Sequence, residues 1–214
     1  MFTTQIKKYS LLVIGITIVC LGIAFAIISE IGVAPIGSLP NALSFTLPIT
    51  TGQLTIALNI IFVLLQKYLL KSDFKAIQWL QILISFFMGI LIDSFVNVLI
   101  FLKSHNYVLN LLFALIGIIL LGLGLAIELA AKVDLMIPAD GLVRAISATK
   151  KIAFSKVKIG FDLSLMILAL LATLIFNHQL LGIREGTLLS ALLTGLCVKY
   201  FQALGRYYQT NSHT

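Results

Sequence analysis

The sequence predicts an all-α integral membrane protein with six transmembrane helices, built as an inverted internal repeat of three plus three. Composition, six long apolar segments and a similarity between the two halves of the chain lead to this prediction. Of its 214 residues, 60% are hydrophobic and 11% are charged, and the mean hydropathy is +1.09. Soluble domains contain about 45–50% apolar and about 25% charged residues. A soluble all-helical protein, the alternative, would need a core that hides runs such as "LLVIGITIVCLGIAFAII".

Six segments are long and apolar enough to cross a bilayer, which takes about 20 mostly apolar residues in a helix. In lipid, backbone polar groups must be bonded within their own segment, and these segments lack the alternation typical of barrel strands, so we expect helices. The expected spans are Ser10–Ser29, Gly52–Leu70, Gln78–Ile100, Val108–Ala130, Val157–Phe176 and Gly186–Leu204.

The lysine and arginine residues predict the orientation, because the cytoplasmic loops of membrane proteins are enriched in them. With six spans, all but two of the 15 basic residues fall on one side of the membrane, the exceptions being Lys103 and Arg184. We therefore expect both termini in the cytoplasm. The net charge of +7 then reflects topology and attraction to anionic lipid, and no nucleic-acid partner is expected.

The links after the first and fourth spans are long and resemble each other. Each contains a proline followed by a short amphipathic stretch, "SLPNALSF" in the first link and "DGLVRAIS" in the second. A shift of 103 residues places Pro35 on Pro138 and Asn59 on Asp162. The two links are therefore interpreted as copies of one element.

Each copy, residues 1–104 and 105–214, contains three spans. Because three is an odd number, the second copy is inserted in the opposite orientation to the first, as in many secondary transporters. One proline-bearing link then faces outward and the other inward. Non-helical backbone is tolerated at membrane depth where it lines a cavity, so the pattern allows both links to be re-entrant.

Two polar residues inside the spans are candidates for a substrate site, since such residues are costly in lipid. Asn59 lies in the second span, and its repeat mate Asp162 lies in the fifth. In an inverted repeat they approach each other near the centre of the membrane. Asp162 could then hold a proton, pair with a cation or bind an amine. The alternative is that both form interhelical hydrogen bonds, worth about 0.6–2 kcal/mol each.

The proline-bearing links contribute a second group of candidates for substrate binding. A helix that begins after the proline would direct its free N–H groups toward an anionic solute. The candidates in the links are Pro35, Gly37, Ser38, Pro138, Asp140 and Gly141. Simple helix capping is the alternative for Asp140. Asp93, near the outer end of the third span, is a further candidate.

The sequence contains no phosphate-binding Gly-Lys loop, no zinc-type cluster and no Ser/His/Asp set. We therefore expect no cofactor, no metal and no enzymatic activity. An intramembrane enzyme would need a second acid or nucleophile beside Asp162.

Several motifs stand out in the two halves of the chain. They read "GVAPIGSLPNALS…TGQLTIALNIIFVLLQ" in the first half, and "LMIPADGLVRAIS…FSKVKIGFDLSLM" with "LGIREGTLLSALLTG" in the second. In these motifs the chain resembles the YczE/YitT-type family of small bacterial membrane proteins. The resemblance implies six spans and a location in the bacterial plasma membrane, and it implies no particular substrate.

The leading hypothesis is a secondary transporter of a small solute, with Asp162, Asn59 and the two helix starts along its path. Coupling to a proton or another cation is left open, as is a homo-oligomer in the lipid bilayer. The alternative is a non-transporting membrane partner, or a substrate-binding subunit of a larger complex.

Overall fold

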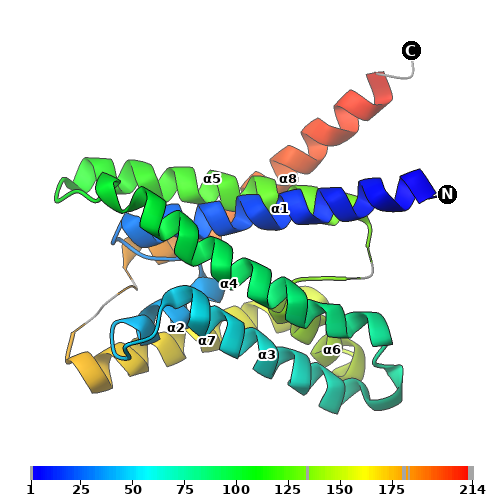
Figure 1. Cartoon of the computed structure of the whole chain (residues 1–214), viewed down its shortest axis with the longest axis horizontal. Helices are drawn as coiled ribbons and strands as arrows, with labels where there is room; N and C mark the ends of the chain where they lie inside the picture. The colour runs from blue at the N-terminus through cyan, green and yellow to red at the C-terminus, as the bar shows by residue number, and fades with distance from the viewer. Residues whose placement is uncertain (1, 134, 180–181, 183, 212–214) are drawn as a thin grey trace. The chain divides into compact units, whose positions relative to one another are not determined.

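The computed structural model describes residues 2–133, 135–179, 182 and 184–211, and in this part of the chain all regular secondary structure is helical. Six helices are long and apolar enough to cross a membrane (Figure 1). They are α1 (Phe2–Ile28), α3 (Thr51–Leu70), α4 (Leu80–Leu99), α5 (Tyr107–Ala131), α7 (Phe154–Asn177) and α8 (Glu185–Asn211). For the described residues, the prediction of an all-helical protein with six helices long and apolar enough to span a membrane is confirmed.

The two long links contain the short helices α2 (Pro35–Ser44) and α6 (Pro138–Lys150). Both begin at proline, whose fixed φ suits a first helical residue and whose missing N–H is not needed there. Three short 3₁₀ helices complete the secondary structure of the described residues. They are η1 (Lys71–Asp73), η2 (Ala76–Trp79) and η3 (Ile100–Leu102).

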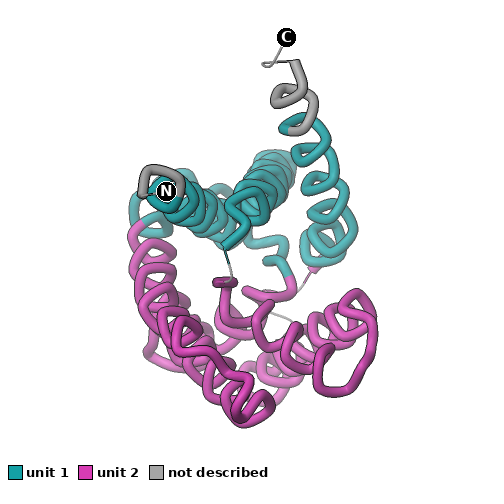
Figure 2. The backbone as a smooth tube through the Cα atoms, turned by 90° about the vertical axis from the view of Figure 1, so that its right-hand side faces the viewer, with its two compact units in different colours: residues 1–34, 95–133, 185–214 teal, residues 35–94, 134–184 magenta. Residues whose placement is uncertain are grey.

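The chain divides into two compact units, each drawn from both halves of the sequence (Figure 2). Unit 1 comprises Met1–Ala34, Phe95–Val133 and Glu185–Thr214, and unit 2 comprises Pro35–Ser94 and Asp134–Arg184. Unit 1 therefore contains α1, α5 and α8, whereas unit 2 contains α2, α3, most of α4, α6 and α7. The boundaries of the two units differ from those of the expected repeats, residues 1–104 and 105–214. A unit groups helices that pack together, whereas a repeat groups segments similar in sequence, so the repeats stay a prediction.

Unit 1 is held together by the close approach of α1 and α5 at glycines. A Cβ atom on Gly15 would lie 2.9 Å from the carbonyl oxygen of Gly124, and one on Gly22 would lie 2.9 Å from that of Gly117. Since the earlier glycine of α1 meets the later glycine of α5, the two helices run antiparallel. Small residues of this kind allow the backbones of membrane helices to approach closely.

Unit 2 is built around the two short helices. Helix α2 packs against α7 and α3, and α6 packs against α3 and α7. A buried apolar cluster joins α3, α6 and α7 through Phe62, Ala139, Leu142 and Leu165. The starts of both short helices, Pro35 and Pro138, are buried. This packing holds the beginning of each short helix inside the unit.

Candidate functional site

All nine residues predicted from the sequence as a substrate site lie in unit 2. They are Pro35, Gly37, Ser38, Asn59, Asp93, Pro138, Asp140, Gly141 and Asp162. The structure brings Asp140 and Asp162 together around a lysine. It places Pro138 and Gly141 against a pair of buried amides, and it places Asp93 at the start of α3.

Unit 2 contains a cluster of three charged side chains, formed by Asp140, Lys158 and Asp162, which we call the Asp–Lys–Asp cluster. The Lys158 Nζ lies 2.8 Å from Asp140 Oδ1 and 3.0 Å from Asp162 Oδ1. The three side chains are only 18%, 29% and 26% exposed, respectively. One lysine faces two carboxylates, so the cluster has a net charge of −1. Within the described residues, no group of His, Cys, Asp and Glu side chains is placed to hold a metal ion.

The cluster depends on where α6 packs against α7. Asp140 lies in the first turn of α6, while Lys158 and Asp162 are separated by four residues on α7. Side chains at this spacing are neighbours on a helix surface. Sequence reasoning counted Lys158 only as a topology signal. Its spacing from Asp162 was the signal that could have identified it.

A buried amide pair, Gln66 of α3 and Gln81 of α4, lies against the start of α6. The Gln66 Nε2 donates to Gln81 Oε1 at 2.9 Å and to the Pro138 carbonyl at 3.0 Å. The Gln81 Nε2 donates back to Gln66 Oε1 at 3.2 Å. The two side chains are 0% and 2% exposed. This pair, which sequence reasoning missed inside its apolar spans, ties α3 and α4 to α6.

Gly141 is required by this arrangement, because a Cβ atom there would lie 2.7 Å from Gln66 Oε1. We expect Gly141→Ala to displace the amide pair and to lower the free energy of unfolding by about 1–3 kcal/mol, as overpacking does. Thermal unfolding of the purified protein in detergent measures the change.

Gly160 provides the matched control, since a Cβ atom there would meet nothing within 4 Å. Gly160→Ala is expected to be neutral or to stabilise α7 by up to about 1 kcal/mol, because alanine favours helix over glycine. Equal effects of the two substitutions would contradict the role assigned to Gly141.

Asp93 of α4 binds the N-terminus of α3. Its Oδ2 accepts a hydrogen bond from the Thr50 hydroxyl at 2.5 Å, and its Oδ1 accepts one from the Gly52 backbone N–H at 2.8 Å. Thr50 in turn caps α3 by accepting from the Gln53 N–H. A negative charge at this end of a helix is favourable. These contacts describe a helix cap, and solute binding by Asp93 stays a prediction.

Asp93→Ala is expected to lower the free energy of unfolding by about 1–3 kcal/mol, because two donors lose a charged acceptor. Asp73→Ala, at an exposed position in η1, is the control and should change it by no more than about 0.5 kcal/mol. Denaturant unfolding in detergent compares the two. A loss no larger than that of the control would show that the cap contributes nothing.

Asn59 and the start of α2 lie in the interior of unit 2. Asn59 is 4% exposed, and its Nδ2 has no hydrogen-bond partner within the described residues. It therefore does not donate to Asp162. Pro35 and Gly37 are buried, and the buried Ser38 hydroxyl donates to the Pro35 carbonyl at 2.6 Å. The start of α2 is thus buried, and the Ser38 hydroxyl is already used within the helix, while the Asn59 amide retains unused donors.

Residues 6–203 match the family of unknown function DUF6198. The chain belongs to this family. The DUF6198 match includes both short helices and extends into all six candidate spans, so the family assignment does not rest on one part of the chain. A relative, "Uncharacterized protein YyaS" of Bacillus subtilis (strain 168), is 32% identical over 201 residues, which cover 92% of this chain and 93% of YyaS. No solved structure matches the chain. The resemblance to the YczE/YitT-type family stays a prediction.

Proposed function

We propose that this DUF6198 protein is a secondary transporter of a small solute in the bacterial plasma membrane, with both termini in the cytoplasm. The observation that carries the proposal is the Asp–Lys–Asp cluster, which places three partly buried charges at the start of α6 and inside the candidate span α7. Ionisable side chains within spans are costly, and they typically mark solute or ion pathways. Interrupted helices whose ends meet near such charges are typical of transporter sites.

The packing within each unit supports the inverted repeat in this proposal. In the repeat, α2 corresponds to α6 and α3 to α7. Helix α2 packs on α7, and α6 packs on α3, so exchanging the two halves exchanges these two contacts. In unit 1, Gly15 of α1 corresponds in the repeat to Gly117 of α5, and Gly22 corresponds to Gly124. Exchanging the two halves therefore turns the Gly15–Gly124 contact into the Gly22–Gly117 contact, and both are present. Their antiparallel course is the relation expected between copies inserted in opposite orientations.

The proposal also makes α2 and α6 re-entrant, one from each face of the membrane. With 10 and 13 residues, they are about 15–20 Å long, which is too short to cross the bilayer. Both begin at a buried proline, as expected of helices that start within the membrane.

The cluster favours transport over intramembrane hydrolysis. An enzyme of that kind would need a second acid beside Asp162, and Asp140 lies there. Paired carboxylates that act as an acid and a base share a proton between them. Here Lys158 forms an ion pair with each of them, which suits the binding of a proton or cation better than hydrolysis.

Flux through the pure protein tests the proposal. The protein is reconstituted in vesicles, and uptake of a panel of amino acids, sugars, small carboxylates and amines is followed under proton and sodium gradients. We expect gradient-driven accumulation of one solute class without any added partner. Absence of flux for the whole panel under both gradients would contradict autonomous transport and would favour the alternative of a binding subunit that depends on another module.

A further inference from the structure

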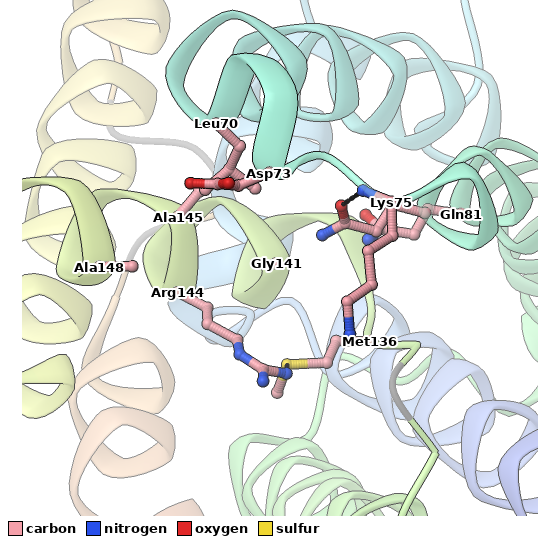
Figure 3. A pocket seen from close by; sticks show the side chains of 10 residues that line it. Leu70, Asp73, Lys75, Gln81, Met136, Gly141, Arg144, Ala145 and Ala148 are labelled. Atoms are coloured by element: carbon pink, nitrogen blue, oxygen red, sulfur yellow. Dashed lines mark hydrogen bonds between the residues drawn. The ribbon is translucent and has the colours of Figure 1, made fainter.

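The start of α6 is occupied by contacts of the protein itself. The Gly141 N–H donates to the carbonyl of the residue before the helix at 3.0 Å, and the Pro138 carbonyl accepts from Gln66. A cavity of about 160 Å³ borders this region (Figure 3), and the two basic residues on its wall, Lys75 and Arg144, already have partners of their own. A ligand would have to compete with these contacts, so the start of α6 is not the better candidate for a binding site.

The start of α2, by contrast, has backbone donors that the protein does not use. Pro35, Gly37 and Ser38 are buried. Among the described residues, the backbone N–H groups of Ile36, Gly37 and Ser38 have no acceptor. Such groups are normally capped or hydrated, and they form the positive end of the helix dipole. A buried helix start without acceptors is therefore suited to a negatively charged group.

Asn59 lies level with the start of α2. Helices α2 and α3 pack against each other as a hairpin, and the Thr51 hydroxyl donates to the Ser44 hydroxyl at 3.1 Å at its closed end. Gly37 lies seven residues before Ser44, and Asn59 lies eight residues after Thr51. At 1.5 Å per residue, these positions are about 10 and 12 Å from the closed end. Asn59 and the first turn of α2 are therefore at the same depth.

The Asn59 amide adds a side-chain donor at this depth. Its side chain is 4% exposed, and its Nδ2 has no hydrogen-bond partner within the described part of the chain. Phe62, one turn farther along α3, belongs to the buried cluster against which Ile36 of α2 packs. The side of α3 that carries both residues therefore faces the first turn of α2. Since buried amides normally find a partner, an unused amide here is a second, independent sign of a ligand.

The two helix starts have equivalent surroundings under the proposed repeat. The shift of 103 residues that relates the two copies also relates members of the apolar cluster in pairs. These pairs are Ile36 with Ala139, Leu39 with Leu142, Leu58 with Phe161, and Phe62 with Leu165. Exchanging the two halves therefore maps these residues of the cluster onto one another, and the start of α2 can be compared with the start of α6 residue by residue.

The comparison shows which group is missing at the start of α2. The polar pairs under the same shift are Gly37 with Asp140, Thr55 with Lys158, and Asn59 with Asp162. In the second copy, the Asp140 carboxylate lies in the first turn of α6. Gly37 carries no side chain at the equivalent position. The first copy thus has neutral donors and lacks the carboxylate that the second copy contains.

We propose that the start of α2 binds the carboxylate of a small organic solute. The backbone N–H groups of Gly37 and Ser38 and the Asn59 amide donate to its oxygens, so the solute supplies the group that Asp140 supplies in the other copy. These donors are neutral, so they suit a singly charged group better than a doubly charged phosphate, whose burial without a counterion is costly. The choice of a carboxylate, and its identification as the transported solute, rest on the repeat and the transporter of the proposed function.

Calorimetry on the full chain in detergent tests the site, with lactate and benzoate as probes and benzamide as the neutral control. We expect at least one of the carboxylates to bind and benzamide not to bind. Asn59→Leu should weaken binding at least tenfold and leave thermal unfolding unchanged or raise its midpoint, because an apolar group of similar size replaces an unbonded amide. Asn97→Leu, at an exposed position of α4, is the control and should leave the affinity unchanged.

Gly37→Asp provides a second test, because it places a carboxylate where the other copy has Asp140. The folded variant should no longer bind lactate or benzoate. Inorganic phosphate, titrated in the same way, distinguishes a general anion site from a carboxylate site. Binding of neither carboxylate, equal binding to wild type and Asn59→Leu, undiminished binding to folded Gly37→Asp, or binding of phosphate alone would each overturn the proposal. Benzamide binding as tight as that of benzoate would do the same.

The outcomes also separate this site from the proposed function. Carboxylate binding that Asn59→Leu abolishes, without flux of any solute, would overturn only the transporter. Flux of a neutral or cationic solute without carboxylate binding would overturn only this site.

Discussion

Replacing Asp162 with asparagine is expected to reduce gradient-driven flux at least tenfold while the protein remains folded. The substitution preserves the shape of the side chain and removes its charge, so the Asp–Lys–Asp cluster becomes neutral. Lys158 keeps its ion pair with Asp140 at 2.8 Å, which limits the loss of stability. Flux into vesicles of the solute identified in the panel measures the effect, and thermal unfolding checks the fold.

The matched control is Glu30→Gln, which also changes a carboxylate to an amide. Glu30 forms an exposed ion pair with Lys103 in unit 1, with 52% and 44% of the two side chains exposed. Exposed pairs contribute about 0–1 kcal/mol, so flux and stability should both be retained. Full flux in Asp162→Asn would show that the charge of Asp162 is not needed for transport and would contradict its assignment to the site.

Replacing Lys158 with methionine is expected to lower the free energy of unfolding. It leaves Asp140 and Asp162 as neighbouring carboxylates without their counterion. Breaking a fully buried pair costs about 3–5 kcal/mol, and the partial exposure of these side chains lowers the expected loss to about 1–3 kcal/mol. Denaturant unfolding in detergent measures it.

A charge-balanced variant separates charge from packing. Combining Lys158→Met with Asp140→Asn and Asp162→Asn removes the lysine and both carboxylates, so most of the lost stability should return. Residues in one ion-pair network are coupled, and this recovery is the expected departure from additivity. A triple variant as unstable as Lys158→Met alone would show that packing of the lysine stem, rather than its charge, holds the cluster together.

The helices could be predicted from the sequence because their signals are local. Length and apolar content identified the six spans. The prolines at positions 35 and 138 marked where α2 and α6 begin. Asp162, Asp140 and Gly141 could also be selected, because a carboxylate inside a span and a turn after a proline are visible without knowledge of packing.

The contacts that build the site could not be predicted, because they depend on how distant helices pack. Lys158 joins Asp140 only because α6 folds back on α7. The amide pair forms only because Gln66 and Gln81 meet across α3 and α4. Asp93 caps α3 because Gly52 and Gly89 let the helices cross closely; a Cβ atom on Gly52 would lie only 2.1 Å from the Gly89 carbonyl oxygen. The grouping into two units has the same origin.

The central claim is that the two halves are inserted in opposite orientations, so that α2 and α6 enter from opposite faces of the membrane. Single cysteines report this directly. They are introduced at Thr46, after α2, and at Lys151, after α6, in a variant in which Cys20 and Cys197 are replaced by alanine. Spheroplasts are treated with a membrane-impermeant maleimide before and after permeabilisation.

Two reference positions calibrate the labelling: Ser104, in the link expected outside, and Ser72, in the link expected in the cytoplasm. We predict that Thr46→Cys reacts in intact spheroplasts, as Ser104→Cys does. We predict that Lys151→Cys reacts only after permeabilisation, as Ser72→Cys does. Reaction of Thr46→Cys and Lys151→Cys from the same face would contradict the inverted repeat and the transporter built on it.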